Sequence, residues 1–141
     1  MILTEYGVGS GAQSVSLPND LMWVDEHDWT PPAGLATYAL DGSFIVEVVA
    51  RLGGRPITLE ATDKSMAWIT RAVLEQLYLW SQTPEKLFTL QFTYPTDTRS
   101  FVVGFRVQDT SPIKAVPVKG FPGPDVSDYF NVTLNLQEMP Q

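Results

Sequence analysis

Cysteine is absent from this chain of 141 residues, which excludes a disulfide framework and a thiolate metal site. No apolar run is long enough to cross a bilayer, and the N-terminus lacks the basic start and apolar segment of a signal peptide. We therefore expect neither membrane insertion nor secretion. Basic residues are scarce too, because 9 Lys and Arg stand against 16 Asp and Glu, for a formal charge of −7. This balance argues against a protein that grips nucleic acid by its phosphates.

Histidine occurs once, in the stretch WVDEHDWTPP that runs from Trp23 to Pro32. Beside His27 lie three carboxylates, which together form what we call the acidic loop: Asp25, Glu26 and Asp28. A metal site needs several ligands that converge on one ion, and a calcium loop of EF-hand type needs alternating acids, a central glycine and a distal glutamate. Neither pattern is present, and the chain has no Gly-x-Ser-x-Gly elbow and no phosphate loop. We expect no catalytic residue, no cofactor and no metal ion.

The two tryptophans that flank the acidic loop are better interpreted as anchors. Trp23 and Trp29 carry large apolar areas that fix a loop, while the acids stay hydrated or pair with arginine from the same or a neighbouring subunit. The residues that we expect to serve as structural or interface positions are Trp23, Asp25, Glu26, Asp28, Trp29, Arg51, Arg55, Leu77 and Trp80.

The chain has 44% hydrophobic residues and the length of one domain, so we treat residues 1–141 as a single domain. The segment 43–52 is rich in β-branched and aromatic residues and predicts a strand. Gly53-Gly54 follows, a dipeptide typical of a tight hairpin, and the segment 55–62 alternates apolar and polar residues. We expect these two strands to pair antiparallel.

One helix is predicted over 70–81, with Thr70 as its N-cap and Val73, Leu77 and Trp80 on its buried face. Segments 86–94 and 98–109 predict a strand pair around a turn, and 129–139 alternates strictly and predicts a half-buried strand. The glycine-rich segment 7–20 and the proline-rich segment 119–128 are expected to be loops. The expected fold is mainly β (α+β), with two packed antiparallel sheets or a flattened barrel and one flanking helix.

The order of these segments supports a resemblance. The chain presents, in sequence, LPNDLMWVDEHDW, GGRPITLEAT, MAWITRAVLEQL, LFTLQF, RSFVVGFRV and YFNVTLNLQEM. This order resembles structural proteins of the tail or baseplate of long-tailed bacteriophages, in the families with the tail-tube fold. The resemblance implies two antiparallel sheets with one flanking helix, no catalytic residues and assembly into hexameric rings around the DNA channel.

Further expectations follow from the same resemblance. Partners are other copies of the chain and neighbouring tail or baseplate proteins, DNA passes through without specific binding, and the protein is located in the virion tail after assembly in the host cytoplasm. The sequence departs from a typical tube subunit because no long hairpin insertion is obvious between its strands. Tube subunit, distal tail ring and adaptor to the hub all remain open positions.

Two other functions are compatible with the sequence. The chain could be a monomeric β-sandwich module that binds carbohydrate or peptide through exposed aromatic residues such as Tyr38, Trp68 or Phe121. A less favoured alternative is a small hydrolase or metal-binding protein that uses the cluster from Asp25 to Asp28.

Overall fold

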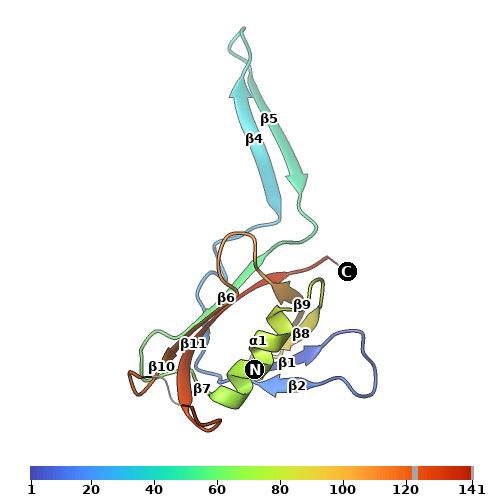
Figure 1. Ribbon diagram of the computed structural model, residues 1–141. Helices are drawn as coiled ribbons and strands as arrows, with labels where there is room; N and C mark the ends of the chain where they lie inside the picture. The colour runs from blue at the N-terminus through green and yellow to red at the C-terminus, as the bar shows by residue number, and fades with distance from the viewer. Residues whose placement is uncertain (122–123, 141) are drawn as a thin grey trace.

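The computed structural model describes residues 1–121 and 124–140, which form a β-rich body from which one long hairpin projects (Figure 1). The elements are β1 (Ile2–Glu5), β2 (Ser14–Ser16), β3 (Met22–Trp23), β4 (Pro32–Tyr38), β5 (Phe44–Ala50), β6 (Pro56–Glu60), β7 (Trp68–Thr70), α1 (Arg71–Ser81), β8 (Phe88–Gln91), β9 (Ser100–Phe105), β10 (Ile113–Pro117) and β11 (Tyr129–Glu138). The fold class expected from the sequence is confirmed: the protein is mainly β, with one helix and two antiparallel sheets.

The large sheet forms the body and is organised around β11. Its strand order is β2-β1-β8-β9-β11-β6-β3, and β7 and β10 pair with β11 as well. Leu134 of β11 lies opposite Leu59 of β6 on one edge and opposite Ile113 of β10 on the other, so β11 has partners along both edges. The sheet does not close into a barrel, but it curls strongly. Its β3 end approaches the region of β8 and β9, where the Trp23 ring contacts Phe92 and Phe101.

The core lies inside this curl, under the helix. The alternation predicted for the last strand is confirmed for its apolar set, since Phe130, Val132, Leu134 and Leu136 are all buried. Asn135 of the polar set is buried as well, against the prediction. The predicted helix is also confirmed: the Thr70 side chain accepts a hydrogen bond from the backbone N–H of Val73 at 3.4 Å, and Leu77 and Trp80 are buried. Trp80 packs on Phe88 with 4.9 Å between ring centroids, so the helix is fixed to the sheet through its aromatic face.

The strand pair predicted downstream of the helix is β8 and β9, which are antiparallel with Phe88 opposite Val103. Phe88, Leu90 and Phe92 face the core as their alternation predicts. Six strands were not predicted: β1, β2, β3, β4, β7 and β10. The expectation of a loop over 7–20 is wrong for residues 14–16, which form β2, and β10 lies in the proline-rich region before 119–128. Described residues of 119–128 contain no strand before β11 begins, while residues 122–123 lie outside the described residues.

The pairing expected for segment 43–52 is wrong. The strand β5 is present, but it pairs with β4, whereas β6 pairs with β11 and β3. The turn between β4 and β5 is Asp41-Gly42, where Gly42 has a φ of 87° and the Asp41 carboxylate accepts a hydrogen bond from the backbone N–H of Ser43. Gly53-Gly54 instead bends the chain from the hairpin into β6, and the Gly54 N–H donates to the carbonyl of Glu138.

The expectation that the chain lacks a long hairpin is also wrong, because β5 pairs with β4. Strands β4 and β5 form the second sheet, a two-stranded ribbon of seven residue pairs that extends away from the body (Figure 1). Every residue of the ribbon is exposed except Ala33, which is half-buried. In the described part of the chain, no helix is long and apolar enough to span a bilayer.

Candidate functional site

The projecting hairpin is the most unusual surface of the protein, because its residues are apolar although solvent surrounds it. Directly opposed residues of an antiparallel pair lie on the same face, so the register divides the hairpin into two faces. Face A contains Gly34, Ala36, Tyr38, Phe44, Val46 and Val48, and face B contains Ala33, Leu35, Thr37, Ile45, Glu47 and Val49. Face A has no charged residue, and face B has one.

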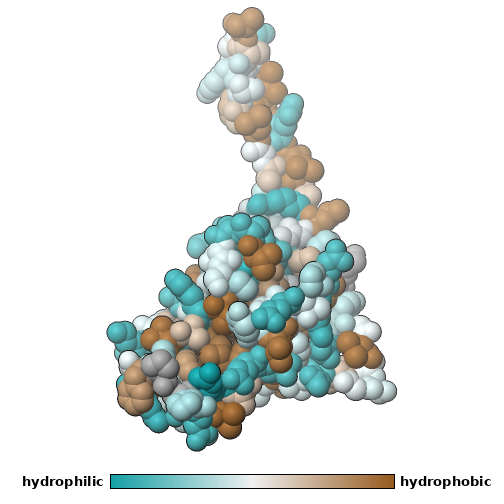
Figure 2. Space-filling view, viewed as in Figure 1, coloured by the Kyte–Doolittle hydropathy of each residue, from teal (hydrophilic) through white to brown (hydrophobic). Residues whose placement is uncertain are grey.

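The exposed apolar area of the hairpin is large for a molecule of this size. Leu35, Tyr38 and Val48 are 68%, 72% and 65% exposed, and Leu40 at the tip is fully exposed. With Phe44, Ile45, Val46, Val49 and Leu52, these side chains present on the order of 1,000 Å² of surface. A monomeric protein rarely exposes more than a few hundred Å² of contiguous apolar surface. Figure 2 shows this concentration of hydrophobic residues along the arm.

The base of the hairpin is held by two residues that the sequence singled out. The guanidinium of Arg51 lies over the ring of Trp29 at 4.5 Å from its centroid, and it also donates to the carbonyl of Thr30. The backbone N–H of Arg51 donates to the carbonyl of Pro31 at 2.8 Å. Trp29 and Arg51 therefore tie the strand that enters the hairpin to the strand that leaves it, a cross-connection that we call the hairpin root.

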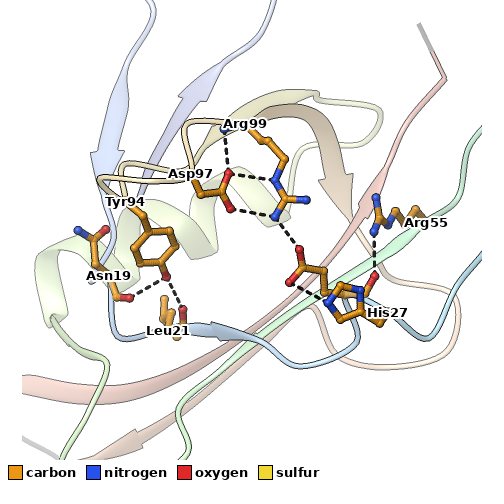
Figure 3. A network of polar contacts seen from close by, with 8 residues as sticks. Asn19, Leu21, His27, Arg55, Tyr94, Asp97 and Arg99 are labelled. Carbon is orange, nitrogen blue, oxygen red and sulfur yellow. Dashed lines mark hydrogen bonds and ion pairs between the residues drawn. The ribbon is translucent and has the colours of Figure 1, made fainter.

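The acidic loop lies immediately before the hairpin root and is bound to the body by its acids. The carboxylate of Asp25 accepts hydrogen bonds from the backbone N–H and the hydroxyl of Thr58, at 3.0 and 2.8 Å. Glu26 pairs with Arg99 at 2.6 Å, and its backbone carbonyl accepts from Arg55 at 2.8 Å (Figure 3). The interpretation that these acids pair with arginine of the same chain is thus correct for Glu26.

Arg99 is shared between the acidic loop and the turn after β8. It binds Asp97 through two nitrogens, at 2.9 and 2.8 Å, in addition to Glu26 (Figure 3). Hydrogen bonds from Arg99 lower the pKa of Asp97, and those same bonds to Asp97 and Glu26 raise the pKa of the guanidinium. Arg99 thus joins the acidic loop to the turn after β8 through hydrogen bonds between charged groups.

The remaining polar residues of this region do not form a metal site. His27 contacts Glu26 at 3.8 Å, but its side chain is 90% exposed, and Asp28 is exposed as well. Among the described residues, no group of three or more histidine, aspartate or glutamate side chains is placed to hold an ion. Asp25, Glu26 and Asp28 are directed to different partners or to solvent.

Trp23 and Arg55 meet inside the body. The Trp23 ring stacks on Phe92 at 5.8 Å, packs edge-on against Phe101 and carries the Arg55 guanidinium at 4.6 Å from its centroid. Its indole N–H donates to the carbonyl of Pro56 at 3.3 Å. Trp23 is 8% exposed, so it anchors the acidic loop, whereas half-buried Trp29 belongs to the hairpin root.

The other residues proposed from the sequence fall elsewhere. Leu77 and Trp80 are buried under the helix and take part in the core rather than in an interface. Tyr38 lies on the hairpin against Phe44, while Trp68 lies on β7 against Tyr129, so these two aromatics belong to different regions of the molecule. Phe121 is 60% exposed and lies in the segment after β10.

Sequence reasoning missed the hairpin residues as a functional surface. The available signal was Asp-Gly between two apolar segments, a strong hairpin signature. A second signal was the run FIVEVVA, which is apolar at both alternating sets of positions and is therefore typical of a strand covered on both faces. No family model, curated protein or solved structure matches the chain.

Proposed function

We propose that the protein is a non-enzymatic structural subunit that forms a ring in a bacteriophage tail or baseplate, and that its β4–β5 hairpin is the arm that joins neighbouring subunits. The observation that carries this proposal is the apolar hairpin, which is left uncovered on both faces in the single chain. The order of elements along the sequence supports the assignment to a tail, and the hairpin supports assembly.

Physical reasons favour a covered hairpin in the working state. An isolated two-stranded ribbon is marginally stable in water, because it buries little apolar surface and leaves both backbone edges unpaired. The order of 1,000 Å² of apolar surface on the two faces of the arm is comparable with the roughly 800 Å² that one partner contributes to a standard protein interface. Burial of this area in a neighbour provides a dry environment for the apolar side chains.

The charge of the chain suits a channel through which DNA moves. With −7 per subunit, a ring of several copies carries a strongly acidic surface that repels phosphates. The wall of such a channel guides the polymer without retaining it. Salt confines this repulsion to about 8 to 10 Å near physiological ionic strength, so the effect acts only close to the wall.

The test is the mass of the assembled protein when both faces of the hairpin are disrupted. The double substitution Phe44→Asp with Ile45→Asp places one carboxylate on each face, at positions that are 59% and 44% exposed, so the body is expected to fold normally. Mass photometry should show loss of the oligomer formed by the wild type.

Val107→Asp is the matched control, because Val107 is 64% exposed and lies on the body. This variant should assemble like the wild type. An oligomer that is unchanged by the double substitution would refute the hairpin as the assembly arm. A wild-type monomer whose tryptophan fluorescence changes on adding an oligosaccharide would favour the binding module instead.

A further inference from the structure

A groove lies at the end of the body that is far from the hairpin (Figure 1). The groove has a volume of about 290 Å³, and we call it the far-end groove; it is lined by Lys64, Val116, Pro117, Val118, Gly120 and Asn131. Asn131 lies on the outer face of β11, opposite Val116 of β10 on one side and Trp68 of β7 on the other. Both flanking side chains are apolar and exposed, at 61% and 42%.

The walls of the far-end groove are held in place by hydrogen bonds. The indole N–H of Trp68 donates to the carbonyl of Lys64 at 2.9 Å, and the Asn131 amide donates to the carbonyl of Met66 at 2.7 Å. Trp68 also packs against Tyr129 at 5.8 Å between ring centroids. The groove is thus formed in the single chain, and a partner can enter it without first ordering these loops.

The hairpin of the same chain cannot reach this groove. The hairpin joins the body beside Glu138, whose carbonyl accepts from Gly54, whereas the groove lies at Asn131. These positions are separated along β11 by about 23 Å. The hairpin also points away from the end of the body that carries β7 and β10 (Figure 1), so any contact between the two surfaces must be made by two copies.

The two surfaces are complementary in charge as well as in polarity. Between residues 32 and 50 the hairpin contains no basic residue and two acidic ones. Glu47 lies on face B, so Asp41 at the tip is the acidic residue that can meet the rim of the groove when face A docks. The rim of the groove has Lys64, and Lys114 lies two residues before Val116 on the same face of β10. Within the described residues, neither lysine forms a side-chain ion pair. Rim charges of this kind steer association and fix orientation.

The edge of β10 is not itself a good acceptor for another strand. Pro112 and Pro117 bracket it, and prolines and an exposed lysine on an edge strand oppose strand addition. Side chains that enter the groove are therefore favoured over backbone pairing. The best anchors are Tyr38 and Phe44 of face A, whose rings already pack together at 5.0 Å between centroids.

We infer that face A of the hairpin of one copy docks in the far-end groove of a second copy, in a head-to-tail contact. Because donor and receptor lie at opposite ends of the chain, repetition of the contact produces a ring if the rotation closes and a filament if it does not. This inference rests on the proposed function, since it names the surface that receives the assembly arm.

The test combines two variants that each lack one half of the contact. Phe44→Asp disrupts face A and keeps the groove, while Val116→Asp disrupts the groove and keeps the hairpin. Each variant alone should be monomeric, with a thermal melt close to that of the wild type because both positions are exposed. An equimolar mixture should form a discrete dimer, since one intact hairpin can enter one intact groove. Val107→Asp serves again as the control that assembles normally.

The outcomes separate the inference from the proposed function. Normal assembly of Val116→Asp would overturn the far-end groove as the receptor and leave the hairpin as the arm. Normal assembly of the Phe44→Asp and Ile45→Asp double variant would overturn the arm itself. Two monomeric variants that form no dimer on mixing would overturn the head-to-tail contact, and a wild type that is monomeric at every concentration would overturn both proposals.

A covalent readout uses the absence of native cysteine. Leu40→Cys at the hairpin tip and Lys64→Cys at the groove rim, mixed as separate chains under oxidation, should give disulfide-linked dimers. The two substitutions in one chain should give a ladder of higher species. Leu40→Cys mixed with Gln108→Cys, an exposed position outside the groove, is the control. Equal cross-linking in the control would contradict specific docking.

Discussion

Replacing Trp23 by alanine should destabilise the protein far more than the same change at Trp29. Trp23 is 8% exposed and contacts Phe92, Phe101 and the Arg55 guanidinium. Truncation of a buried large aromatic residue costs about 3 to 5 kcal/mol, and loss of the stacked guanidinium adds to this cost. We expect about 4 kcal/mol for Trp23→Ala.

Trp29 is half-buried, and its main contact is Arg51 at 4.5 Å. A partly exposed cation–π contact contributes about 0.5 to 1 kcal/mol, which is the expected cost of Trp29→Ala. Because Trp29 is at the hairpin root, its loss should instead weaken assembly through a less firmly oriented arm. The two tryptophans thus separate stability from association.

Urea denaturation followed by far-ultraviolet circular dichroism measures both costs, without relying on the fluorescence of the residue that is removed. The midpoint should fall strongly for Trp23→Ala and slightly for Trp29→Ala, with the slope unchanged for a two-state transition. Trp23→Phe is the control that retains ring stacking and should lie between wild type and alanine. Equal costs for the two alanine variants would refute the distinction between anchor and root.

Four other predictions follow from the fold and its polar network. Leu77→Asp should prevent folding, because Leu77 is fully buried; a soluble variant with a cooperative melt would contradict the position of the helix. Changing the three carboxylates of the acidic loop to asparagine should leave the fold intact, at a cost of about 1 to 2 kcal/mol in the free energy of unfolding. A structural role would be refuted if the wild type bound Zn²⁺ or Ca²⁺ stoichiometrically and this variant did not. Arg99 lowers the pKa of Asp97, so the Asp97 carboxylate stabilises the fold at a pH above its unfolded pKa of about 3.9. This contribution is lost as the pH falls through the lower pKa of the folded state. Asp97→Asn should therefore make the stability less dependent on pH on the acid side. Gel shifts should detect no binding to duplex DNA even at low salt, and salt-sensitive binding would contradict a non-retaining channel.

Local patterns predicted the elements whose signals were strong and unopposed. The helix had a capping threonine and three apolar residues at helical spacing, and β11 had strict alternation from Phe130 to Gln137. Each of these signals lies within one segment, so it can be read from the sequence without knowing the fold. The apolar face of each element then has to be covered, as Leu77 and Leu134 are in the core.

The partner of β5 could not be chosen by local rules. Asp41-Gly42 and Gly53-Gly54 flank β5 on its two sides, and both dipeptides are suitable for hairpin turns. Pairing with β4 prevails because β6 is taken into the body by β11 and β3. The contact of Glu26 with Arg99 spans 73 positions, and no periodicity connects residues so far apart. The acidic loop was therefore visible as a cluster, but its role became clear only from the fold.

The apolar hairpin also shows why its exposure was not foreseen. A run such as FIVEVVA normally indicates a strand inside a core, and in this chain it lies outside the body. The sequence pattern predicts that both faces of the strand are buried. It does not distinguish burial in the core of the same chain from burial against a neighbouring copy. This ambiguity is resolved by the shape of the single chain.

Electron microscopy of the purified wild-type protein distinguishes a ring-forming subunit from a monomer. We expect closed rings, six-fold if the resemblance to tail-tube proteins extends to symmetry, with the hairpin of each copy seated on its neighbour. Particles the size of a single chain at every concentration, with the hairpin still uncovered, would contradict this expectation.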